Sequence, residues 1–403
     1  MRPQEAIWQF VVVSAVVLGI IARQPLLIGS GALLIVLGLL GPIWAGRSLR
    51  HLTYTREIRQ PRVFPDEPVD VVIQIDNRKL LPVIWLQVED ENPSEAQWTR
   101  GRVAAAHQSS RQTLLQFLSL GWFQRVRRHY QVRFPQRGYY ALGPAKLTTS
   151  DGMGLSEATW TVEQQDRVVV YPRLLEPPAL ELLLRTPGTD VAVRHGLLDD
   201  LTRMVGVRPY QSGDPLRFVH WKATARTGQL QVKLFQPAVV AGTAIFLNLR
   251  TKEHVWQGFN RDWIEASISL AASLFQAELA AGHRAGFFAN GQMAEMGPGP
   301  WQELTADAGQ LPVLLEGLAR VITGFASEME ALLARTIPTL PFGTTLLLVT
   351  AMASEELWSL LADARAKGYA AIVLWVGDEE APAPPPGVLL QNVAWREVGG
   401  WRS

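Results

Sequence analysis

A cluster of basic residues between Arg203 and Phe235 is the densest group of chemically active side chains in this sequence. It contains six Lys or Arg residues and a single acid, Asp214, in a chain whose 38 basic and 37 acidic residues nearly balance. Because the whole chain carries a formal charge of only +1, the electrostatic effects that matter must be local. Nothing in this balance predicts a nucleic-acid partner.

The middle of the cluster has the pattern of a helix followed by a short strand. Asp214 followed by Pro215 is typical of an N-cap and a first helical residue, and Gly228 is typical of a helix end. The pattern predicts a helix from Pro215 to about Arg226. Lys222 and Arg226 are spaced i, i+4, and like charges at this spacing destabilise an isolated helix by about 0.2–0.5 kcal/mol. The helix therefore needs an anion between them.

Three sources of that anion are open. A carboxylate of the same chain, such as Asp199 or Asp200, would make the cluster an internal structural clasp. A carboxylate on a partner would make it a binding surface, and a phosphate would make it an anionic-ligand site. His220 and Trp221 fit packing or hydrogen-bonding roles better than those of a general base and a stacking platform, because no nucleophile accompanies them. Ser212 is explained as a turn residue.

Standard catalytic motifs are missing: the chain has no phosphate-binding glycine loop, no zinc-protease motif and no dinucleotide-binding fingerprint after a strand. The absence of cysteine removes disulfides, thiol nucleophiles and cysteine-bound zinc. The Gly-Ser-Gly run at 29–31 lies in an apolar segment and fits helix packing better than a nucleophile elbow. We therefore expect no cofactor, no catalytic residue and no enzyme activity. The polar cluster of Asp214, His220 and Lys222 keeps an enzyme as an alternative.

Two uncharged segments at the start of the chain, residues 6–22 and 26–45, are apolar enough to cross a bilayer. At about 1.5 Å per helical residue they reach roughly 25 and 30 Å. Only three residues, beginning with Arg23, separate them, so the two helices would run antiparallel. The pattern predicts a transmembrane helical hairpin over residues 1–46, with the membrane contact at 6–45. A cleaved signal peptide would need a small-residue cleavage site before the polar turn.

Charges at the two ends of this hairpin predict its orientation. Arg23 lies at the turn, whereas Arg2, Arg47, Arg50 and Arg56 lie on the side of the termini. Basic residues collect on the cytoplasmic side of membrane spans. We therefore expect a multi-pass protein of the inner (plasma) membrane whose soluble domains face the cytoplasm.

Residues 47–175 have the composition of a β-rich domain, with β-branched and aromatic runs separated by Pro, Gly and Asn turns. Strands are expected at 69–75, 82–88, 129–134 and 167–172. Without a convincing amphipathic helix, these strands predict a small, immunoglobulin-like β-sandwich. Residues 125–137 hold five arginines and no acid. The wet outer face of a half-exposed strand explains them, and a contact with anionic lipid is the alternative.

Residues 241–403 show a different period, in which continuous apolar runs alternate with helical patterns. Strands are expected at 244–249, 284–289, 344–351 and 370–377, and helices at 263–281 and 354–367. Ser354 fits an N-cap and Gly368 fits a helix end. This alternation predicts a doubly wound, mostly parallel α/β domain of Rossmann-like type. Residues 176–240 then form a separate segment that carries the basic motif.

The stretch RPYQSGDPLRFVHWKATARTGQLQVKLF at 208–235 resembles the signature of the domain-of-unknown-function 58 family, which has Tyr-x-x-Gly-Asp, an Arg, a Trp, an Ala-Arg pair and a Val-Lys in this order. The matching residues are Tyr210, Gly213, Asp214, Arg217, Trp221, Ala225, Arg226, Val232 and Lys233, and His220 and Lys222 complete the candidate interaction motif. RGYYALGP at 137–144, DGMGL at 151–155 and VVYPRL at 169–174 extend the likeness. Pro209 departs from the signature, which usually has an acid before the Tyr.

This resemblance implies a von Willebrand factor type A-like fold for the C-terminal domain. It also implies partners: a MoxR-type AAA+ ATPase and a membrane protein with a transglutaminase-like domain, which are often encoded beside such proteins. The type A fold often binds a divalent ion through Asp-x-Ser-x-Ser after its first strand, because a hard cation needs closely spaced oxygen ligands. Asn248, Arg250 and Lys252 stand there in this sequence, so we predict a degenerate site without a metal.

The leading hypothesis is therefore a non-enzymatic, membrane-anchored adaptor or assembly factor that binds protein partners. One alternative is an anionic-ligand or anionic-lipid binding protein that uses the basic residues of 208–233. Binding of that kind weakens in high salt, because exposed charges are screened. The other alternative is an uncharacterised enzyme.

Overall fold

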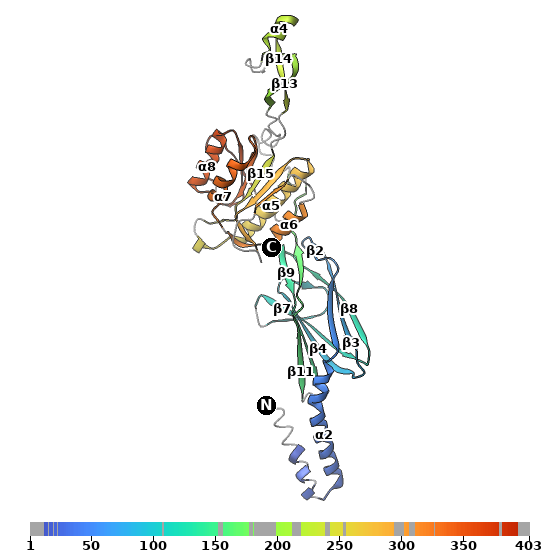
Figure 1. The fold of residues 1–403 in the computed structure, drawn as a ribbon. Helices are drawn as coiled ribbons and strands as arrows, with labels where there is room; N and C mark the ends of the chain where they lie inside the picture. The colour runs from blue at the N-terminus through green and yellow to red at the C-terminus, as the bar shows by residue number, and fades with distance from the viewer. Residues whose placement is uncertain are drawn as a thin grey trace. The chain divides into compact units, whose positions relative to one another are not determined.

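The computed structural model describes residues 12–14, 16–18, 20–21, 23–106, 109–151, 156–176, 180, 199–211, 219–237, 242–252, 255–293, 302–305, 311–325, 327–378 and 381–393. The chain divides into two compact units, Met1–Tyr171 and Pro172–Ser403. It is a β-rich, multi-domain protein with a long apolar helix near its N-terminus (Figure 1).

The apolar helix α2 (Pro25–Ser48) leaves large apolar side chains such as Leu33 and Leu39 exposed. Its segment Ile28–Ser48 is the one candidate membrane span among the described residues. The described residues of the preceding segment, within 12–21, are also helical, and Gly31 of α2 lies directly against Val16. This close approach agrees with a helix-packing role for Gly31 of the Gly-Ser-Gly run, whereas Gly29 has no such neighbour. The rest of the first predicted membrane segment lies outside the described residues.

Twelve strands follow α2 in the described part of the N-terminal unit. They are β1 (Leu52–Ile58), β2 (Arg62–Val63), β3 (Val69–Asn77), β4 (Val83–Pro93), β5 (Gln97–Trp98), β6 (Arg102–Ala105), β7 (Arg111–Leu120), β8 (Arg125–Arg133), β9 (Gly138–Leu142), β10 (Ala145–Ser150), β11 (Glu157–Val162) and β12 (Asp166–Val170). They form sheets of order β1-β3-β8-β5, β11-β10-β4-β7-β6 and β2-β12-β9. All four strands expected here from the sequence are present, as β3, β4, β8 and β12.

One hydrophobic core lies between these sheets. It takes Val71 and Ile73 from β3, Leu86 and Val88 from β4, and Val168 from β12, all at most 1% exposed. Period-2 alternation sends these side chains inward and leaves polar ones outside. The sheets therefore form the β-sandwich that the sequence predicts.

Strand β8 shows why residues 125–137 are rich in arginine. Arg125 and Arg127 lie on its exposed face, where Arg125 Nε is 2.7 Å from Asp76 Oδ1 and Arg127 Nη2 is 3.7 Å from Glu57 Oε2. Asp76 comes from the neighbouring strand β3 and Glu57 from β1, the next strand of the same sheet. The prediction of a half-exposed strand is confirmed, and its charges are partly balanced within the sheet.

In the C-terminal unit, strands β13 (Asp199–Pro209) and β14 (Gln231–Pro237) pair as an antiparallel two-stranded ribbon, with the short helix α4 (Trp221–Thr227) between them in sequence. The predicted helix start at Pro215 lies outside the described residues, whereas Val219 and His220, which the prediction placed inside the helix, precede α4. Val219 forms an isolated bridge with Val232, and the N-cap is His220, whose Nδ1 accepts from Ala223 N–H at 3.0 Å. Asp214 therefore does not cap this helix. The predicted end at Gly228 is confirmed by its left-handed φ of 71°.

The rest of this unit is built on a six-stranded sheet of order β18-β16-β15-β20-β21-β22, in which only β18 is antiparallel among the described strands. The strands are β15 (Thr243–Leu247), β16 (Ala285–Ala289), β18 (Gln302–Thr305), β20 (Thr345–Thr350), β21 (Ala370–Trp375) and β22 (Leu389–Asn392). A separate pair is formed by β17 (Gly291–Met293) and β19 (Val321–Phe325). The predicted parallel sheet is confirmed.

Helices cover both faces of this sheet. They are α5 (Arg261–Ala280), α6 (Leu311–Arg320), α7 (Met329–Thr336) and α8 (Glu355–Ala366), with the short 3-10 turns η2 (Val255–Gln257) and η4 (Ile337–Thr339). Phe246 and Leu348 pack with α7 and α8, whereas Phe287 meets Phe275 of α5 on the other face, with ring centroids 6.0 Å apart. As predicted, Ser354 caps α8 by accepting from Leu357 N–H at 3.1 Å.

Candidate functional site

The basic motif lies on the β13–β14 ribbon and on α4. Six of its nine predicted residues are described: Tyr210, His220, Trp221, Lys222, Arg226 and Lys233. The other three lie outside the described residues: Gly213, Asp214 and Arg217. Tyr210 follows β13, and its backbone N–H donates to Leu230 O at 2.9 Å. Lys233 is half-buried in β14, opposite Val207 of β13. The ribbon thus fixes both ends of the motif.

None of the residues of helix α4 is buried, and all but Ala223 and Thr224 are exposed. Trp221 is 70% exposed, so the packing role predicted for it is wrong. His220 has the hydrogen-bonding role that was predicted, because its ring caps the helix and its backbone N–H donates to Gln231 O at 2.7 Å. A large aromatic side chain is therefore presented to solvent by a helix that is attached at both ends.

Lys222 and Arg226 lie exposed on the same helix, one turn apart. Among the residues that the structure describes, neither forms an ion pair with a carboxylate. Asp199 and Asp200 were considered above as internal partners, and their side chains are not among those that the structure describes. The surface of α4 thus combines a solvated tryptophan with two cations, a composition typical of interaction hot spots.

A second polar group gathers at the carboxyl edge of the parallel sheet. Asn248 follows β15, as the sequence predicts, Asn290 follows β16, and Thr350 ends β20. Asn248 Nδ2 donates to Thr350 Oγ1 at 3.0 Å, and Asn290 Nδ2 donates to Asn248 Oδ1 at 2.9 Å. Because neighbouring parallel strands end at one edge, three residues far apart in sequence meet there. Sequence reasoning missed Asn290.

The two basic residues beside this edge, Arg250 and Lys252, also contact other residues of the chain. Arg250 Nη1 is 2.6 Å from Glu328 Oε2, and Lys252 Nζ lies 5.1 Å from the centre of the Trp263 ring. Oδ1 of Asn248 accepts from Arg250 N–H as well, at 3.1 Å. A hard divalent cation needs several free oxygen ligands. The residues at this edge, with their amide oxygens occupied and two cations beside them, do not fit such an ion.

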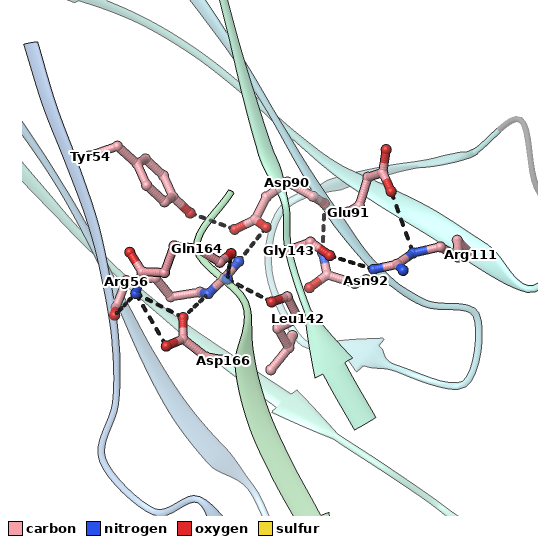
Figure 2. Close-up of polar contacts among 10 residues, drawn as sticks. All are labelled: Tyr54, Arg56, Asp90, Glu91, Asn92, Arg111, Leu142, Gly143, Gln164 and Asp166. Carbon is pink, nitrogen blue, oxygen red and sulfur yellow. Dashed lines mark hydrogen bonds and ion pairs between the residues drawn. The ribbon is translucent and has the colours of Figure 1, made fainter. Parts of the chain in front are cut away.

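A third polar group, which sequence reasoning did not predict, lies inside the β-sandwich (Figure 2). Arg56 of β1 is fully buried: Nη1 is 2.5 Å from Asp90 Oδ1, Nε is 2.7 Å from Asp166 Oδ2, and Nη2 donates to Leu142 O at 2.7 Å. Tyr54 Oη donates to the other Asp90 oxygen at 2.7 Å. Arg56, counted in the sequence among the basic residues on the side of the hairpin's termini, is thus buried in the sandwich. The period-2 pattern of β1, which sends Leu52, Tyr54 and Arg56 inward, was the available signal.

The environment of this group changes the ionisation of its members. Burial raises the pKa of the Asp90 carboxyl, against the opposing effects of the Arg56 guanidinium and the Tyr54 hydroxyl. Burial, with the charge of Asp90, also raises the pKa of Tyr54 well above its usual value. Gly143 has a φ of 101°, and a Cβ there would collide with Gln164 O and with the Arg56 guanidinium. The family-like run at 137–144 thus includes a glycine that this arginine requires.

A cavity of about 320 Å³ lies over the outer face of the sheet that contains β3 and β8. Its lining includes Arg59, Arg100 and His129, with Asp70 as the acid among the residues that line it. Gln131 Nε2 donates to Asp70 Oδ1 at 3.0 Å. The cavity therefore has a cationic lining in the described part of the sandwich.

Comparison with known proteins bears on the basic motif first. Residues 206–301 match the family model described as a protein of unknown function, DUF58. The predicted resemblance to this family is thus confirmed over that segment. The segment begins within β13 and ends beyond β17. A relative, the uncharacterized protein YeaD of Bacillus subtilis (strain 168), is 24% identical over 252 residues. That alignment covers 62% of this chain and 58% of the relative.

Among solved structures, matches to two small domains cover less than a third of this chain each. A CARDB domain from Pyrococcus furiosus, solved in complex with di-metal ions, is 14% identical, with coverage of 30% of this chain and 93% of that chain and a TM-score of 0.18. A cohesin module from a Clostridium perfringens family 33 glycoside hydrolase is 12% identical, with coverage of 29% and 96% and a TM-score of 0.20. Scores this low carry no argument about fold or function.

Proposed function

We propose that the chain is a non-enzymatic, membrane-anchored adaptor that captures a protein partner through α4 and the β13–β14 ribbon. The observation that carries this proposal is the surface of α4, where Trp221 is 70% exposed beside Lys222 and Arg226. Isolated two-stranded ribbons are marginally stable in water. An exposed aromatic with two cations on such an element favours a binding surface over a part of the core.

Membrane anchoring is supported by α2. Its exposed leucines and isoleucines, including Leu33, Leu39 and Ile43, are satisfied by lipid rather than by water. We propose that the helix and the segment before it form a hairpin in the inner (plasma) membrane, with the sandwich and the α/β unit in the cytoplasm. Because Arg56 is buried, this orientation depends on Arg2, Arg47 and Arg50 against Arg23.

As the partner we propose an AAA+ ATPase of the MoxR type, with a transglutaminase-like membrane protein as a further member of the assembly. The support is the DUF58 match over residues 206–301, since the resemblance to this family implies these partners. The C-terminal unit is proposed to be of von Willebrand factor type A-like fold, which its doubly wound sheet supports. Its edge network of Asn248, Asn290 and Thr350 contains neither a carboxylate nor a free nucleophile, which supports a binding role.

A photo-crosslinking experiment in cells tests the capture of this partner. The crosslinking amino acid p-benzoylphenylalanine replaces Trp221, whose exposure lets it reach a bound protein. We expect a crosslink to the ATPase, and we expect Arg226→Ala in the same chain to reduce it at least about tenfold, because loss of one partner of an interfacial charge pair costs about 2 kcal/mol or more.

The matched control is Arg365→Ala, which removes an exposed arginine from the last turn of α8. It should leave the crosslink unchanged at equal protein abundance. An equal loss in both variants, or a crosslink that reaches only other parts of the same chain, would show that α4 is an internal clasp and would reject the proposal.

Anion binding is the second candidate function, and the cationic cavity lined by Arg59, Arg100 and His129 favours it. Such a site predicts that the protein binds pyrophosphate and that binding falls steeply between low and high salt, because the cations are exposed. Isothermal titration at two salt concentrations, with Arg59→Ala beside the matched Arg102→Ala, measures this. Binding that is unchanged in Arg59→Ala would exclude the cavity as the site.

A further inference from the structure

Two loops at one end of the β-sandwich expose large apolar side chains. They are residues 78–82, between β3 and β4, and residues 121–124, between β7 and β8; together we call them the tip. Leu80 is 71% exposed, Trp122 71% and Phe123 65%. Contiguous apolar groups of this size are uncommon on a surface that meets only water, and they mark binding sites.

The two loops of the tip are held together by hydrogen bonds. Phe123 N–H donates to Lys79 O at 3.1 Å. The buried Asn77 side chain donates to both loops, to Leu81 O at 3.0 Å and to Gly121 O at 2.7 Å. Leu80, Trp122 and Phe123 therefore belong to one rigid structure, and their exposure is built into the fold.

The backbone at Phe123 adds a second observation. Its φ of 48° lies in the left-handed region. That conformation costs a residue with a Cβ roughly 1–2 kcal/mol, and Gly or Asn adopts it more readily. A phenylalanine at this position is unfavourable for the fold both in its backbone and in its exposed ring. Such unfavourable features are retained where a residue serves in binding.

The tip lies close to the C-terminal end of α2. Arg78 N–H donates to His51 O at 3.1 Å, and His51 is three residues beyond the end of α2 at Ser48. Three residues span at most about 10 Å, and the headgroup layer on one side of a bilayer is about 5–8 Å thick. Figure 1 shows the ends of β3 and β8 beside the C-terminal end of α2.

The charge around the tip is strongly positive. Residues 47–51, 76–82 and 121–125 together hold five Lys or Arg and one acid, Asp76. Asp76 is largely buried and pairs with Arg125 and Arg78, at 2.7 and 3.7 Å. Basic residues near an anionic membrane surface each contribute about 1 kcal/mol of attraction, and aromatic residues collect at the headgroup level.

We propose that the tip inserts Leu80, Trp122 and Phe123 into the headgroup layer of an anionic bilayer, beside the C-terminal end of α2. This inference rests on the proposed membrane anchoring through α2. The helix and the tip would then contact the membrane at two points, and the β-sandwich would be held close to the bilayer surface.

The cysteine-free sequence allows a direct test with single introduced cysteines. The full chain is reconstituted in vesicles of phosphatidylcholine and phosphatidylglycerol, and a nitroxide is attached at Leu33→Cys, Leu80→Cys or Phe117→Cys. Leu33 reports on α2, Leu80 on the tip, and Phe117 is a matched exposed apolar residue on β7, at 44%. Collisions with lipid-soluble oxygen and with a water-soluble nickel chelate measure the depth of each label.

We expect the label at position 33 to collide mainly with oxygen and the label at position 117 mainly with nickel. The depth of the label at position 80 should be intermediate between theirs. Trp122→Ser with Phe123→Ser should shift the label at 80 to the value at 117, and neutral vesicles should shift it in the same direction. If the label at position 80 is as accessible to nickel as the label at position 117, while the label at position 33 lies in lipid, membrane insertion of the tip is rejected and anchoring through α2 stands. If the nickel chelate reaches the label at position 33, both the anchoring through α2 and the insertion of the tip are rejected.

Discussion

At the scale of single residues, the β-sandwich depends on an arginine in its interior. Removing a guanidinium from water costs several kcal/mol, and only close partners offset that cost. Arg56 has them: two carboxylates, Asp90 and Asp166, and the carbonyls of Leu142 and Gln164. These groups come from strands or loops well separated in sequence, so the network fixes the register of several strands at once.

Asp90→Asn should destabilise the N-terminal unit by about 3–5 kcal/mol, because it leaves the buried Arg56 without its closest charge partner. The side chain of Asp90 is 0% exposed. Denaturant unfolding of the full chain in detergent measures the loss. Asp166→Asn is the control, since its side chain is 27% exposed and water can replace part of the interaction. The network would be unimportant if both substitutions cost the same small amount.

The residue scale is also where the sequence predicts least. The partners of Arg56 are 34 and 110 positions away, at Asp90 and Asp166, and no local pattern links them. Asn248 could be placed at a strand end from its own neighbours. Its contacts with Asn290 and Thr350 could not be predicted, because these residues meet only when the sheet forms.

At the scale of elements, burial on both faces made the α/β strands easy to predict. The run that becomes β20 is apolar at nearly every position, since both sides of the strand lie under helices. Helices α6 and α7 were missed because they are short, and α6 contains a proline and a glycine. The start of α4 was misplaced because Val219 pairs with Val232, a tertiary contact that overrides local propensity.

The cap of α4 can be tested by hydrogen exchange at the amide of Ala223. In His220→Ala this amide loses the ring nitrogen that accepts from it, and loss of a cap costs about 0.5–2 kcal/mol. We expect faster exchange in a peptide that covers α4. His220→Asn, which retains a capping acceptor, should restore protection, and Asp214→Ala should leave it unchanged. Faster exchange in Asp214→Ala would instead assign the cap to the aspartate.

At the scale of the whole molecule, the chain has separate cores. One contains Ile73 and Leu86 in the N-terminal unit, and another contains Phe246 and Leu348 in the C-terminal unit. The two compact units meet in sequence at Tyr171 and Pro172. Each unit therefore has the apolar interior that independent folding requires.

We expect two calorimetric transitions for the full chain in detergent. Asp90→Asn should lower the transition of the N-terminal unit by roughly 10 °C, from a few degrees per kcal/mol at this size. Leu348→Ala opens a cavity in the core of the C-terminal unit at a cost of about 2–5 kcal/mol. It should lower the transition temperature of the C-terminal unit alone. A single transition that moves with either substitution would mean that the units unfold as one.

The packing of α2 against β10 and β11, with only three residues between Ser48 and β1, gives the sandwich little freedom to turn about the helix. A spanning helix adjusts its tilt to the thickness of the hydrocarbon layer. In the bilayer proposed for α2, the sandwich would rotate with the helix. A change of about 10° would move a point about 30 Å along a strand by about 5 Å. Membrane thickness would thus set the direction in which the far end of the sandwich points.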